Sequence, residues 1–325
     1  MHVMNNKQKT IKYVYIVGRG HSGSTLLELL LNRHSSIASM GELDLLSLQI
    51  YRDEKTKWIG RCSCGQRPFD CEVWGKVINQ INDKYQINLI NNPFAWRLSD
   101  VGLYEEKANP GITEYIRYKY HRLIRTIFYR KLKKLPKLFE STYKQWVERR
   151  DFVAEKYAEI AKTDVVVDAS KDQLHMRDIE NYSNLDVKII YLTRDVRGNV
   201  WSAIKRNNIR PEQEANDWER LNRKIRKYLS FIDSNKYIHV RYEELCKDPE
   251  EELSRIYKFI GIIPESMGSK EEYSRRHTIA GNKIRFKEIE NIRHDIDWME
   301  NLTEDDLSII KKYAGTLAKD LGYDI

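Results

Sequence analysis

One stretch near the N-terminus combines glycines and hydroxyl side chains in a spacing suited to anion binding. It reads Gly18-Arg19-Gly20-His21-Ser22-Gly23-Ser24-Thr25, between a β-branched run (12–17) and an apolar helical pattern that begins at Leu26. Glycines let a loop turn its N–H groups inward, and the N-terminus of the following helix adds partial positive charge. The stretch is therefore predicted to cradle a phosphate-like group rather than to be an ordinary turn between a strand and a helix.

The same loop differs at one position from the loop that binds nucleoside triphosphates. Gly18, Gly23 and Thr25 keep the spacing of GxxxxGK[ST], but Ser24 stands where the lysine for the β- and γ-phosphates belongs. Without that lysine the loop suits a single phosphate-like group better than a triphosphate with magnesium. The residues therefore speak against a kinase or an ATPase.

Short apolar runs and helical patterns alternate along most of the chain and must position this loop. The runs at 12–17, 164–168, 187–192 and 237–241 are too continuous for strands with one wet face, which predicts buried parallel strands. Helical patterns lie between and after them, at 24–32, 172–182, 196–207, 213–231, 249–260 and 304–320. The predicted fold is α/β, a P-loop NTPase-like doubly wound parallel sheet flanked by helices. Residues 50–160 break the rhythm and are interpreted as a helical, basic insertion within one domain spanning 1–325.

Positive charge is concentrated in that insertion. The 325 residues hold 56 Lys+Arg, 48 Asp+Glu and 41% hydrophobic residues, which excludes a disordered chain and an integral membrane protein. Residues 117–150 hold 12 basic and 2 acidic residues, so the remainder carries 44 and 46, a balance of −2. The basic residues alternate with aromatic and aliphatic ones. This pattern fits an anionic glycan, a lipid headgroup or a nucleic acid as partner, or simply a solvated helical face.

The N-terminus and the cysteines bear on the compartment. The first ten residues do not resemble a secretory signal, and no run approaches the roughly 18 apolar residues of a membrane helix, so a cytoplasmic protein is expected. Three of the four cysteines, Cys62, Cys64 and Cys71, lie close together. Their C-x-C spacing with a long gap differs from the C-x-x-C pairs of zinc knuckles. A loop packed by thiols or a reversible disulfide is favoured, and no metal is expected.

The loop and a later segment resemble the sulfotransferases that use 3′-phosphoadenosine 5′-phosphosulfate (PAPS), in particular the bacterial branch related to tyrosylprotein sulfotransferases. In that family a [KR]-S-G-[ST]-T loop wraps the 5′-phosphosulfate, and here it reads His21-Ser22-Gly23-Ser24-Thr25. A later strand is followed by an Arg and, eight residues on, a Ser that hold the 3′-phosphate. The segment YLTRDVRGNVWSAIKR supplies Arg194 and Ser202 at that spacing.

Further segments extend the resemblance to about residues 12–50 and 160–325. VVVDASKD (165–172) resembles the strand end that delivers a lysine to the active site, and VRYEELCKDPEEEL (240–253) resembles the usual strand, turn and helix. HTIAGNKIRF (277–286) is similar to the loop that closes over the 3′-phosphate end of the donor. The resemblance therefore implies a donor-binding set made of Arg19, Gly20, His21, Ser22, Gly23, Ser24, Thr25, Arg194, Ser202, Gly281, Asn282, Lys283 and Arg285.

Three catalytic residues are implied. Glu42 stands where the tyrosylprotein enzymes carry the glutamate of a Gly-Glu pair, which makes it the base; the other reading is a residue that caps or solvates the next helix. Lys171 follows a predicted strand and would stabilise the transferring sulfonyl group, unless it is a surface lysine. His21 replaces the usual Lys or Arg, so either it donates to the leaving phosphate when protonated or Arg19 and Lys171 carry that charge.

The implied activity is PAPS-dependent transfer of a sulfonate group to an acceptor hydroxyl. A carbohydrate or glycolipid is favoured over a phenol or a peptide tyrosine, and the basic segment points to an anionic or membrane-associated acceptor and leaves peripheral membrane attachment open. No nucleic-acid partner is expected. Two alternatives stay open: a P-loop kinase for a small molecule, because VVVD (165–168) could end a metal-binding strand, and a non-catalytic protein of this fold that binds membranes or nucleic acid.

Overall fold

A parallel β-sheet forms the centre of the molecule. The computed structural model describes residues 11–51, 60–100, 112–266, 277–287, 289 and 291–325. In these residues five strands lie in the order β2-β3-β1-β4-β5. They are β1 (Lys12–Gly18), β2 (Ile37–Gly41), β3 (Val165–Lys171), β4 (Asp186–Thr193) and β5 (Tyr237–Arg241). All pairings are parallel, which confirms the four strands predicted from apolar runs. The predicted burial is wrong for β5, which lies at the edge of the sheet and has only Val240 buried.

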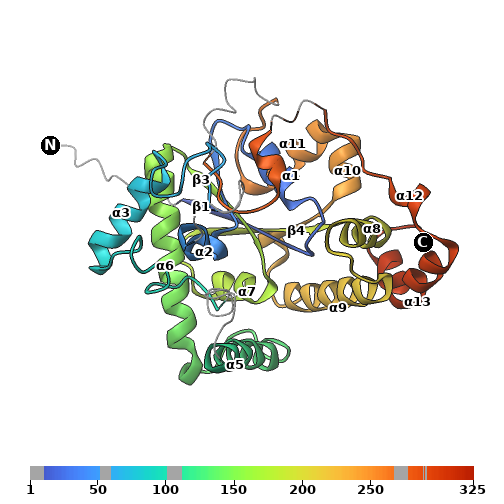
Figure 1. Cartoon of the computed structure of the whole chain (residues 1–325), viewed down its shortest axis with the longest axis horizontal. Coiled ribbons are helices and arrows are strands. Elements are labelled where there is room, and N and C mark those ends of the chain that lie inside the picture. Colours follow the sequence, from blue (N-terminus) through green and yellow to red (C-terminus); the bar gives the residue numbers. More distant parts are fainter. Residues whose placement is uncertain (1–10, 52–59, 101–111, 267–276, 288, 290) are drawn as a thin grey trace.

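Helices cover both faces of the sheet, as Figure 1 shows. Successive residues of a strand point to opposite faces, so β1 supplies Val14 and Ile16 to one core and Tyr13, Tyr15 and Val17 to the other. The first core is covered by α1 (Ser24–Leu31), α10 (Tyr242–Lys247) and α11 (Pro249–Ile260). The second includes residues of α7 (Gln173–Tyr182), α8 (Val196–Asn207), α9 (Pro211–Leu229) and α13 (Glu304–Asp320). The doubly wound α/β fold is therefore confirmed.

The strand that sequence analysis missed is β2. Its sequence, IASMG, has no continuous apolar run, because Ala38, Ser39 and Gly41 interrupt it. It forms through pairing with β3 at the edge of the sheet. This strand matters for the site because Glu42 follows it directly.

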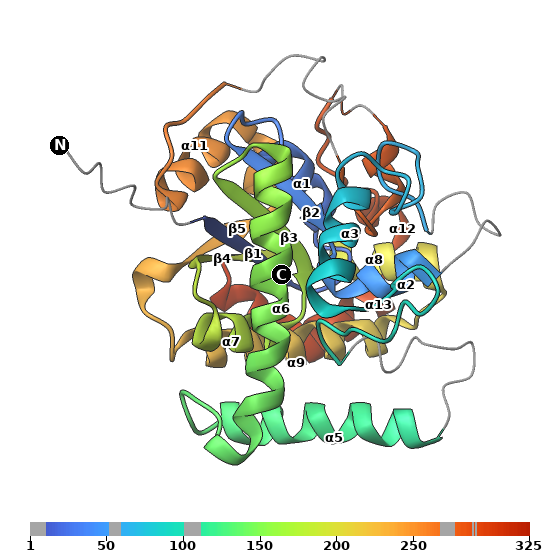
Figure 2. The same cartoon turned by 90° about the vertical axis from the view of Figure 1, so that its left-hand side faces the viewer.

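Residues 50–160 are largely helical where they are described. They include α3 (Trp74–Tyr85), α5 (Ile112–Tyr129) and α6 (Lys137–Ala161), after α2 (Leu46–Tyr51). Figure 2 shows α6 running across the molecule with α5 at its far end. Val147, Ala154 and Tyr157 of α6 join the core that faces β1, so this segment is packed into the domain. The insertion boundaries stay a prediction. No helix among the described residues is both long and apolar enough to cross a membrane.

The remaining elements are short. They connect the larger ones at the rim of the sheet and comprise η1 (Leu43–Leu45), η2 (Ser234–Lys236), η4 (Lys283–Phe286) and α12 (Trp298–Asn301). In a doubly wound sheet the carboxyl ends of the strands form the crevice where ligands bind. Each of the five strands ends next to a segment that sequence analysis singled out, and β5 leads into Tyr242 of segment 240–253.

Candidate active site

The loop between β1 and α1 has a shape that only glycine permits at two positions. A Cβ atom on Gly18 would stand 2.4 Å from the carbonyl oxygen of Leu192 on β4. Gly23 has φ 88°, and a Cβ atom there would lie 2.5 Å from the ring of Tyr242. Both positions therefore require glycine, for close approach and for a left-handed backbone. The loop leads directly into the N-terminus of α1, as an anion cradle requires.

Asn199 of α8 holds this loop from behind, a role that sequence analysis missed. Its side-chain amide donates a hydrogen bond to the carbonyl of Gly20 at 2.7 Å and accepts one from Ser22 Oγ at 3.3 Å. Ser22 is consequently buried and does not line the cavity in front of the loop. Asn199 lies between Arg194 and Ser202 in the sequence, and one helix thus both shapes the loop and supplies the predicted 3′-phosphate ligands.

A cavity of about 560 Å³ opens in front of this loop and is called here the loop cleft. Eleven of the predicted site residues line it, drawn from the ends of four strands and from the 281–282 segment. They are Gly20, His21, Gly23, Ser24, Thr25, Glu42, Lys171, Arg194, Ser202, Gly281 and Asn282. Residues far apart in the sequence therefore meet around one space, as predicted.

Arg194 is held in the loop cleft by several groups. Its guanidinium carbon lies 4.6 Å from the ring centroid of Tyr242, a cation–π contact, and it forms an ion pair with Asp295 at 3.1 Å. Its Nη1 donates to the carbonyl of His21 at 3.2 Å. Arg194 is thus oriented before any ligand binds, which lowers the entropy lost on binding an anion.

Gly281 closes the other side of the cleft. The amide of Asn282 donates to Thr25 Oγ1 at 3.2 Å, and a Cβ atom on Gly281, whose φ is 84°, would lie 3.3 Å from the same oxygen. It would also lie 3.7 Å from Oε1 of Glu42. The predicted late loop therefore contacts both the anion cradle and the predicted base.

Three predicted donor ligands lie outside the loop cleft, besides Ser22. Arg19 forms a bidentate pair with Glu214 at 2.9 and 2.6 Å and lines a neighbouring cavity. Arg285 is buried and donates to the carbonyls of Gly281 and Arg61, at 3.3 and 2.7 Å, so it supports the 281–282 segment from behind. Lys283 is exposed and does not line the cleft. A direct contact of these residues with a donor remains a prediction.

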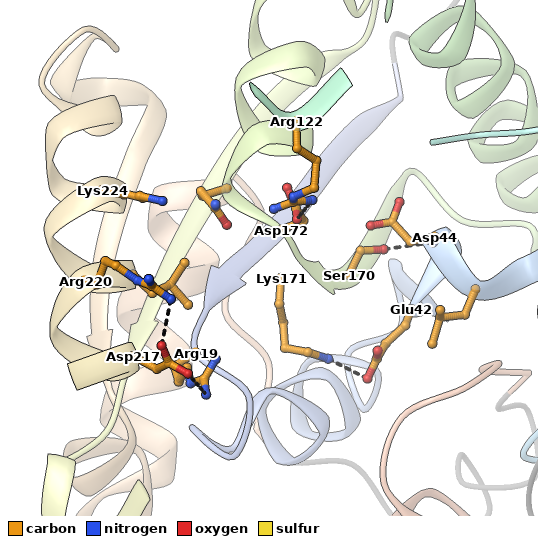
Figure 3. A pocket seen from close by; sticks show the side chains of 13 residues that line it. Arg19, Glu42, Asp44, Arg122, Ser170, Lys171, Asp172, Asp217, Arg220 and Lys224 are labelled. Carbon is orange, nitrogen blue, oxygen red and sulfur yellow. Dashed lines mark hydrogen bonds and ion pairs between the residues drawn. The ribbon is translucent and has the colours of Figure 1, made fainter. Parts of the chain in front are cut away.

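The neighbouring cavity, called here the polar cavity, has a volume of about 480 Å³ and is drawn in Figure 3. Only Leu45 and Leu221 among its lining residues are apolar. The others are Arg19, Glu42, Asp44, Arg122, Ser170, Lys171, Asp172, Gln173, Asp217, Arg220 and Lys224. Arg122 comes from α5, so the basic insertion reaches this cavity. Glu42 and Lys171 line both cavities and therefore mark the place where the two meet.

Glu42 and Lys171 form an ion pair, with 2.5 Å between Oε1 and Nζ. Figure 3 shows the two side chains pointing toward one another. Both are partly exposed, at 17% and 19%. The backbone amide of Glu42 donates to the carbonyl of Ile279 at 3.0 Å, which fixes the start of the side chain. A carboxylate and an ammonium are thus held together at the junction of a cradle for anions and a polar cavity.

The backbone around this pair is strained. Lys171 has φ 71°, a left-handed conformation that costs an L-residue about 1–2 kcal/mol. Gly41, directly before Glu42, has φ 83° and lies so close to Ile279 that a Cβ atom would stand 2.0 Å from its carbonyl oxygen. Such conformations persist where the surrounding structure imposes them, and they concentrate at functional sites.

Buried charges hold these strand ends in place, and one of them, Asp44, also lines the polar cavity. Arg150 of α6 pairs with Asp168 of β3 at 2.8 Å and with Asp44, which follows Glu42 by two residues. His175 of α7 bridges Asp44 and Asp100 at 2.6 Å each. All five side chains are buried. The network connects α6 and α7 to the segment that carries Glu42, and sequence analysis missed it because its members are far apart along the chain.

The charge state of two residues near the cleft departs from the ordinary one. Burial, and then the nearby Arg206, lower the pKa of His21 to about 4, so its imidazole is neutral at neutral pH. Sequence analysis offered two sources of positive charge for the leaving phosphate, a protonated His21 or Arg19 together with Lys171. The neutral imidazole disfavours the first, and in the second Arg19 already pairs with Glu214. Burial, and then Glu42, raise the pKa of Glu28 on α1 to about 8. Lys171 is thus the predicted cation that lies in both cavities.

The parallel sheet, the glycine loop at its crevice and the two joined cavities define an α/β transferase-like site. A family model described as the sulfotransferase family matches residues 14–265. The chain belongs to the sulfotransferase family. No curated protein matches the chain.

Solved structures similar to the chain are bacterial sulfotransferases. The sulfotransferase domain of the Synechococcus PCC 7002 olefin synthase is 15% identical with a TM-score of 0.48, and 98% of each chain is covered. The sulfotransferase domain from the curacin biosynthetic pathway is 17% identical with a TM-score of 0.46, covering 97% of this chain and 98% of the other. For sulfotransferase STF9 from Mycobacterium avium the identity is 13%, the TM-score 0.45 and the coverage 97% and 78%.

Proposed function

We propose that the protein transfers the sulfonate group of PAPS to a hydroxyl of a polar acceptor. The observation that carries this proposal is the Glu42–Lys171 pair at the junction of the loop cleft and the polar cavity. A group-transfer enzyme needs a donor and an acceptor that meet at one point, with a base and a cation beside the reacting atoms. The two cavities meet at these two side chains.

The loop cleft is the proposed donor site. The glycine loop and the N-terminus of α1 suit the 5′-phosphosulfate, which is a compact anion. Arg194 and Ser202 on α8 line the same cleft and would hold the 3′-phosphate. Guanidinium and hydroxyl groups are suitable donors to phosphate oxygens, and Arg194 is already oriented by Asp295 and Tyr242.

The chemistry follows from the two shared side chains. The acceptor oxygen attacks sulfur, so a bond forms between this oxygen and sulfur while the bond from sulfur to the bridging phosphate oxygen breaks. The bond electrons leave with adenosine 3′,5′-bisphosphate, and Glu42 takes the hydroxyl proton. Lys171 stabilises the negative charge that develops on the bridging oxygen. The present ion pair keeps both groups within reach of that point.

The polar cavity is the proposed acceptor site. Eleven of its thirteen lining residues are charged or polar, which suits the many hydroxyls of a carbohydrate better than a phenol ring. Arg220 and Lys224 of α9 lie together on one side of it, and Arg122 lies across from them beside Asp172, as Figure 3 shows. Burial, and then Arg220 and Arg122, lower the pKa of Lys224, the signature of clustered positive charge. An anionic group on the acceptor would relieve this repulsion.

A two-part experiment tests the proposed function. Calorimetry compares adenosine 3′,5′-bisphosphate with ATP and magnesium, and labelled PAPS is then offered with anionic and neutral glycans. We expect metal-independent binding of the bisphosphate and transfer to a glycan. Glu42→Gln is expected to keep bisphosphate binding and to lose about 10²–10⁴-fold in transfer rate. The matched control is Glu148→Gln on the exposed side of α6.

Three outcomes would contradict the proposal or its assignment of the base. A preference for ATP with magnesium would favour the kinase alternative. Absence of nucleotide binding would favour a non-catalytic protein. If Glu42→Gln transferred sulfonate at the rate of the unmodified protein, another residue would be the base.

The exposed side of α5 favours an acceptor at a membrane surface. Ile116, Tyr120, Leu123 and Ile127 follow one another at helical spacing and are 49–58% exposed. Exposed lysines lie just beyond the helix at 131, 133 and 134. An apolar stripe beside basic residues is suited to anionic lipid. Because Arg122 of the same helix lines the polar cavity, we propose that α5 presents this cavity to a glycolipid in an anionic surface.

Vesicle sedimentation tests this placement. Vesicles of phosphatidylcholine with phosphatidylglycerol should retain the protein, and vesicles of phosphatidylcholine alone should not. Replacing Lys131, Lys133 and Lys134 with serine should weaken retention, by about 1 kcal/mol for each lysine at the surface. Serine at the exposed lysines Lys311, Lys312 and Lys319 of α13 removes the same charge elsewhere and serves as the control. Equal losses from both triple variants would disprove a specific role of α5.

A further inference from the structure

The three clustered cysteines meet a histidine that is distant in sequence. Nδ1 of His277 lies 3.1 Å from Sγ of Cys71 and 3.9 Å from Sγ of Cys62, and the two sulfur atoms are 3.6 Å apart. With Sγ of Cys64, all four ligand atoms lie within 4.8 Å of one another. The cysteines are free thiols in this structure. Three thiols and one imidazole therefore converge on one point away from both cavities.

These separations match the edges of a zinc coordination tetrahedron. With Zn–S bonds of about 2.3 Å and Zn–N bonds of about 2.0–2.1 Å, such a tetrahedron has S–S edges of about 3.8 Å and S–N edges of about 3.6 Å. The observed S–S value of 3.6 Å and S–N value of 3.9 Å lie close to these edges, and the other S–N value, 3.1 Å, is shorter than the edge. A disulfide would require two sulfur atoms at about 2.05 Å. The spacing is that of ligands around a metal ion.

The surroundings orient the ligands as second-layer groups do around known zinc ions. Nε2 of His277 lies 3.2 Å from a carboxylate oxygen of Glu72, so with its proton on Nε2 the ring presents a lone pair at Nδ1 to the sulfur atoms. The amide of Trp74 donates to Sγ of Cys71 at 3.5 Å. The carbonyl of His277 accepts hydrogen bonds from Trp74 Nε1 at 2.5 Å and from Tyr157 Oη at 3.0 Å. Both the ring and a thiolate are thus held in place.

We propose that Cys62, Cys64, Cys71 and His277 bind a structural zinc ion. Three thiolates and one imidazole form a closed Cys₃His set of the kind that zinc occupies in structural sites. Sequence analysis expected no metal, because C-x-C followed by a long gap lacks a second pair. The fourth ligand lies 206 residues beyond Cys71, and only the fold brings it there.

The zinc ion would fasten the start of the basic insertion to the segment that closes the loop cleft. Next to the ligands, the amide of Ser63 donates a hydrogen bond to the carbonyl of Thr278. Cys62 and Ile279 form an isolated antiparallel β-bridge. The amide of Ile279 donates a hydrogen bond to the carbonyl of Met40, and the carbonyl of Ile279 accepts one from the amide of Glu42 at 3.0 Å. The proposed ligand His277 is therefore two residues from Ile279, whose carbonyl positions Glu42. The metal itself would touch neither the sulfonate donor nor the acceptor substrate.

Elemental analysis of the protein, purified under reducing conditions, tests this site directly. We expect about one zinc per chain, bound tightly enough to survive dialysis. Cys64→Ser, Cys71→Ser and His277→Gln should each lose most of the zinc, and Glu72→Gln should lower zinc affinity about 10- to 100-fold. Cys246→Ser removes the buried cysteine outside the cluster and should retain the full zinc content.

Cobalt provides a measurement that does not depend on the variants being stable. Cobalt reconstitution of the unmodified chain should give thiolate-to-metal charge-transfer bands and the visible bands of a tetrahedral ion. Because Cys64 is exposed, Cys64→Ser is the variant least prone to misfold. Any of four results would overturn the proposal: iron in place of zinc, a Cys62–Cys71 disulfide without metal, four free thiols that take up neither ion, or full zinc content in all three ligand variants.

Discussion

Replacing Glu28 with glutamine is expected to stabilise the protein at neutral and alkaline pH. Glu28 lies on α1 behind the active site and is 1% exposed, and its Oε1 has no hydrogen-bond partner among the described residues. Burial, followed by repulsion from Glu42, raises its pKa from 4.5 to about 8. The folded protein therefore keeps a proton on this carboxyl that the unfolded chain has already released at pH 7.

The size of the effect follows from these two pKa values. Between about pH 4.5 and pH 8 the folded state holds one proton more than the unfolded state, so the free energy of unfolding falls as pH rises. Each pH unit in this range costs about 1.4 kcal/mol. Glu28 thus costs about 1 kcal/mol at about pH 5, about 3 kcal/mol at pH 7 and about 5 kcal/mol well above pH 8. Glutamine has no proton to lose and avoids this cost.

Urea denaturation of both proteins at several pH values between about 5 and 9 measures this difference. The stability gained by Glu28→Gln should grow with pH and level off above pH 8. Any poor fit of the amide would shift the difference equally at every pH, so the slope carries the test. Glu148→Gln, at an exposed site on α6, should show no such slope. A difference that stays constant from pH 5 to pH 9 would refute a protonated Glu28.

Three further predictions concern the loop cleft and its strained lysine. Arg194→Ala should raise the dissociation constant for adenosine 3′,5′-bisphosphate about 10- to 100-fold, since a hydrogen bond to a charged group contributes about 1.5–3 kcal/mol; calorimetry measures it, and an unchanged constant would exclude Arg194 as a ligand. Lys171→Gly should be about 1 kcal/mol more stable to urea than Lys171→Ala, because φ is 71°, whereas equal stabilities would show that the backbone relaxes. His21→Gln should change bisphosphate affinity at pH 7 by less than about threefold, because the imidazole is neutral there; a larger loss would mean that His21 binds protonated.

The parts of the fold that sequence analysis predicted have strong local signals. Strands β1, β3 and β4 are continuous apolar runs because both of their faces are buried. Strand β2 has only a weak signal, since its serine and glycine are tolerated through pairing with β3. Helix positions followed from apolar periodicity in the same way. The residue pattern thus predicts a strand or helix where burial alone determines which residue types the element contains.

Site residues were predictable where a motif is contiguous and were missed where the fold brings single residues together. The glycine loop and the Arg194–Ser202 spacing each occupy one segment, and both line the loop cleft. Asn199, Tyr242 and His277 lie inside segments that carry the family resemblance, but the motifs assign them no role, because their roles arise from contacts with distant segments. Nothing in the sequence separates such residues from ordinary polar residues of a helix or loop.

Counting charges along the sequence also does not reveal which of them pair with distant segments in the fold, and Arg125 is a testable case. Sequence counting related the basic excess of 117–150 to an anionic partner or to a solvated helical face, yet Arg125 is buried and pairs with Asp100 and Asp178 at 2.6 Å each. Arg125→Met would leave Asp178 with the Tyr129 hydroxyl, which donates to it at 2.6 Å. The expected cost is about 3–5 kcal/mol of unfolding free energy, because a buried carboxylate loses its cation. Urea denaturation measures it, and an unchanged midpoint would mean that this cation contributes little to the fold.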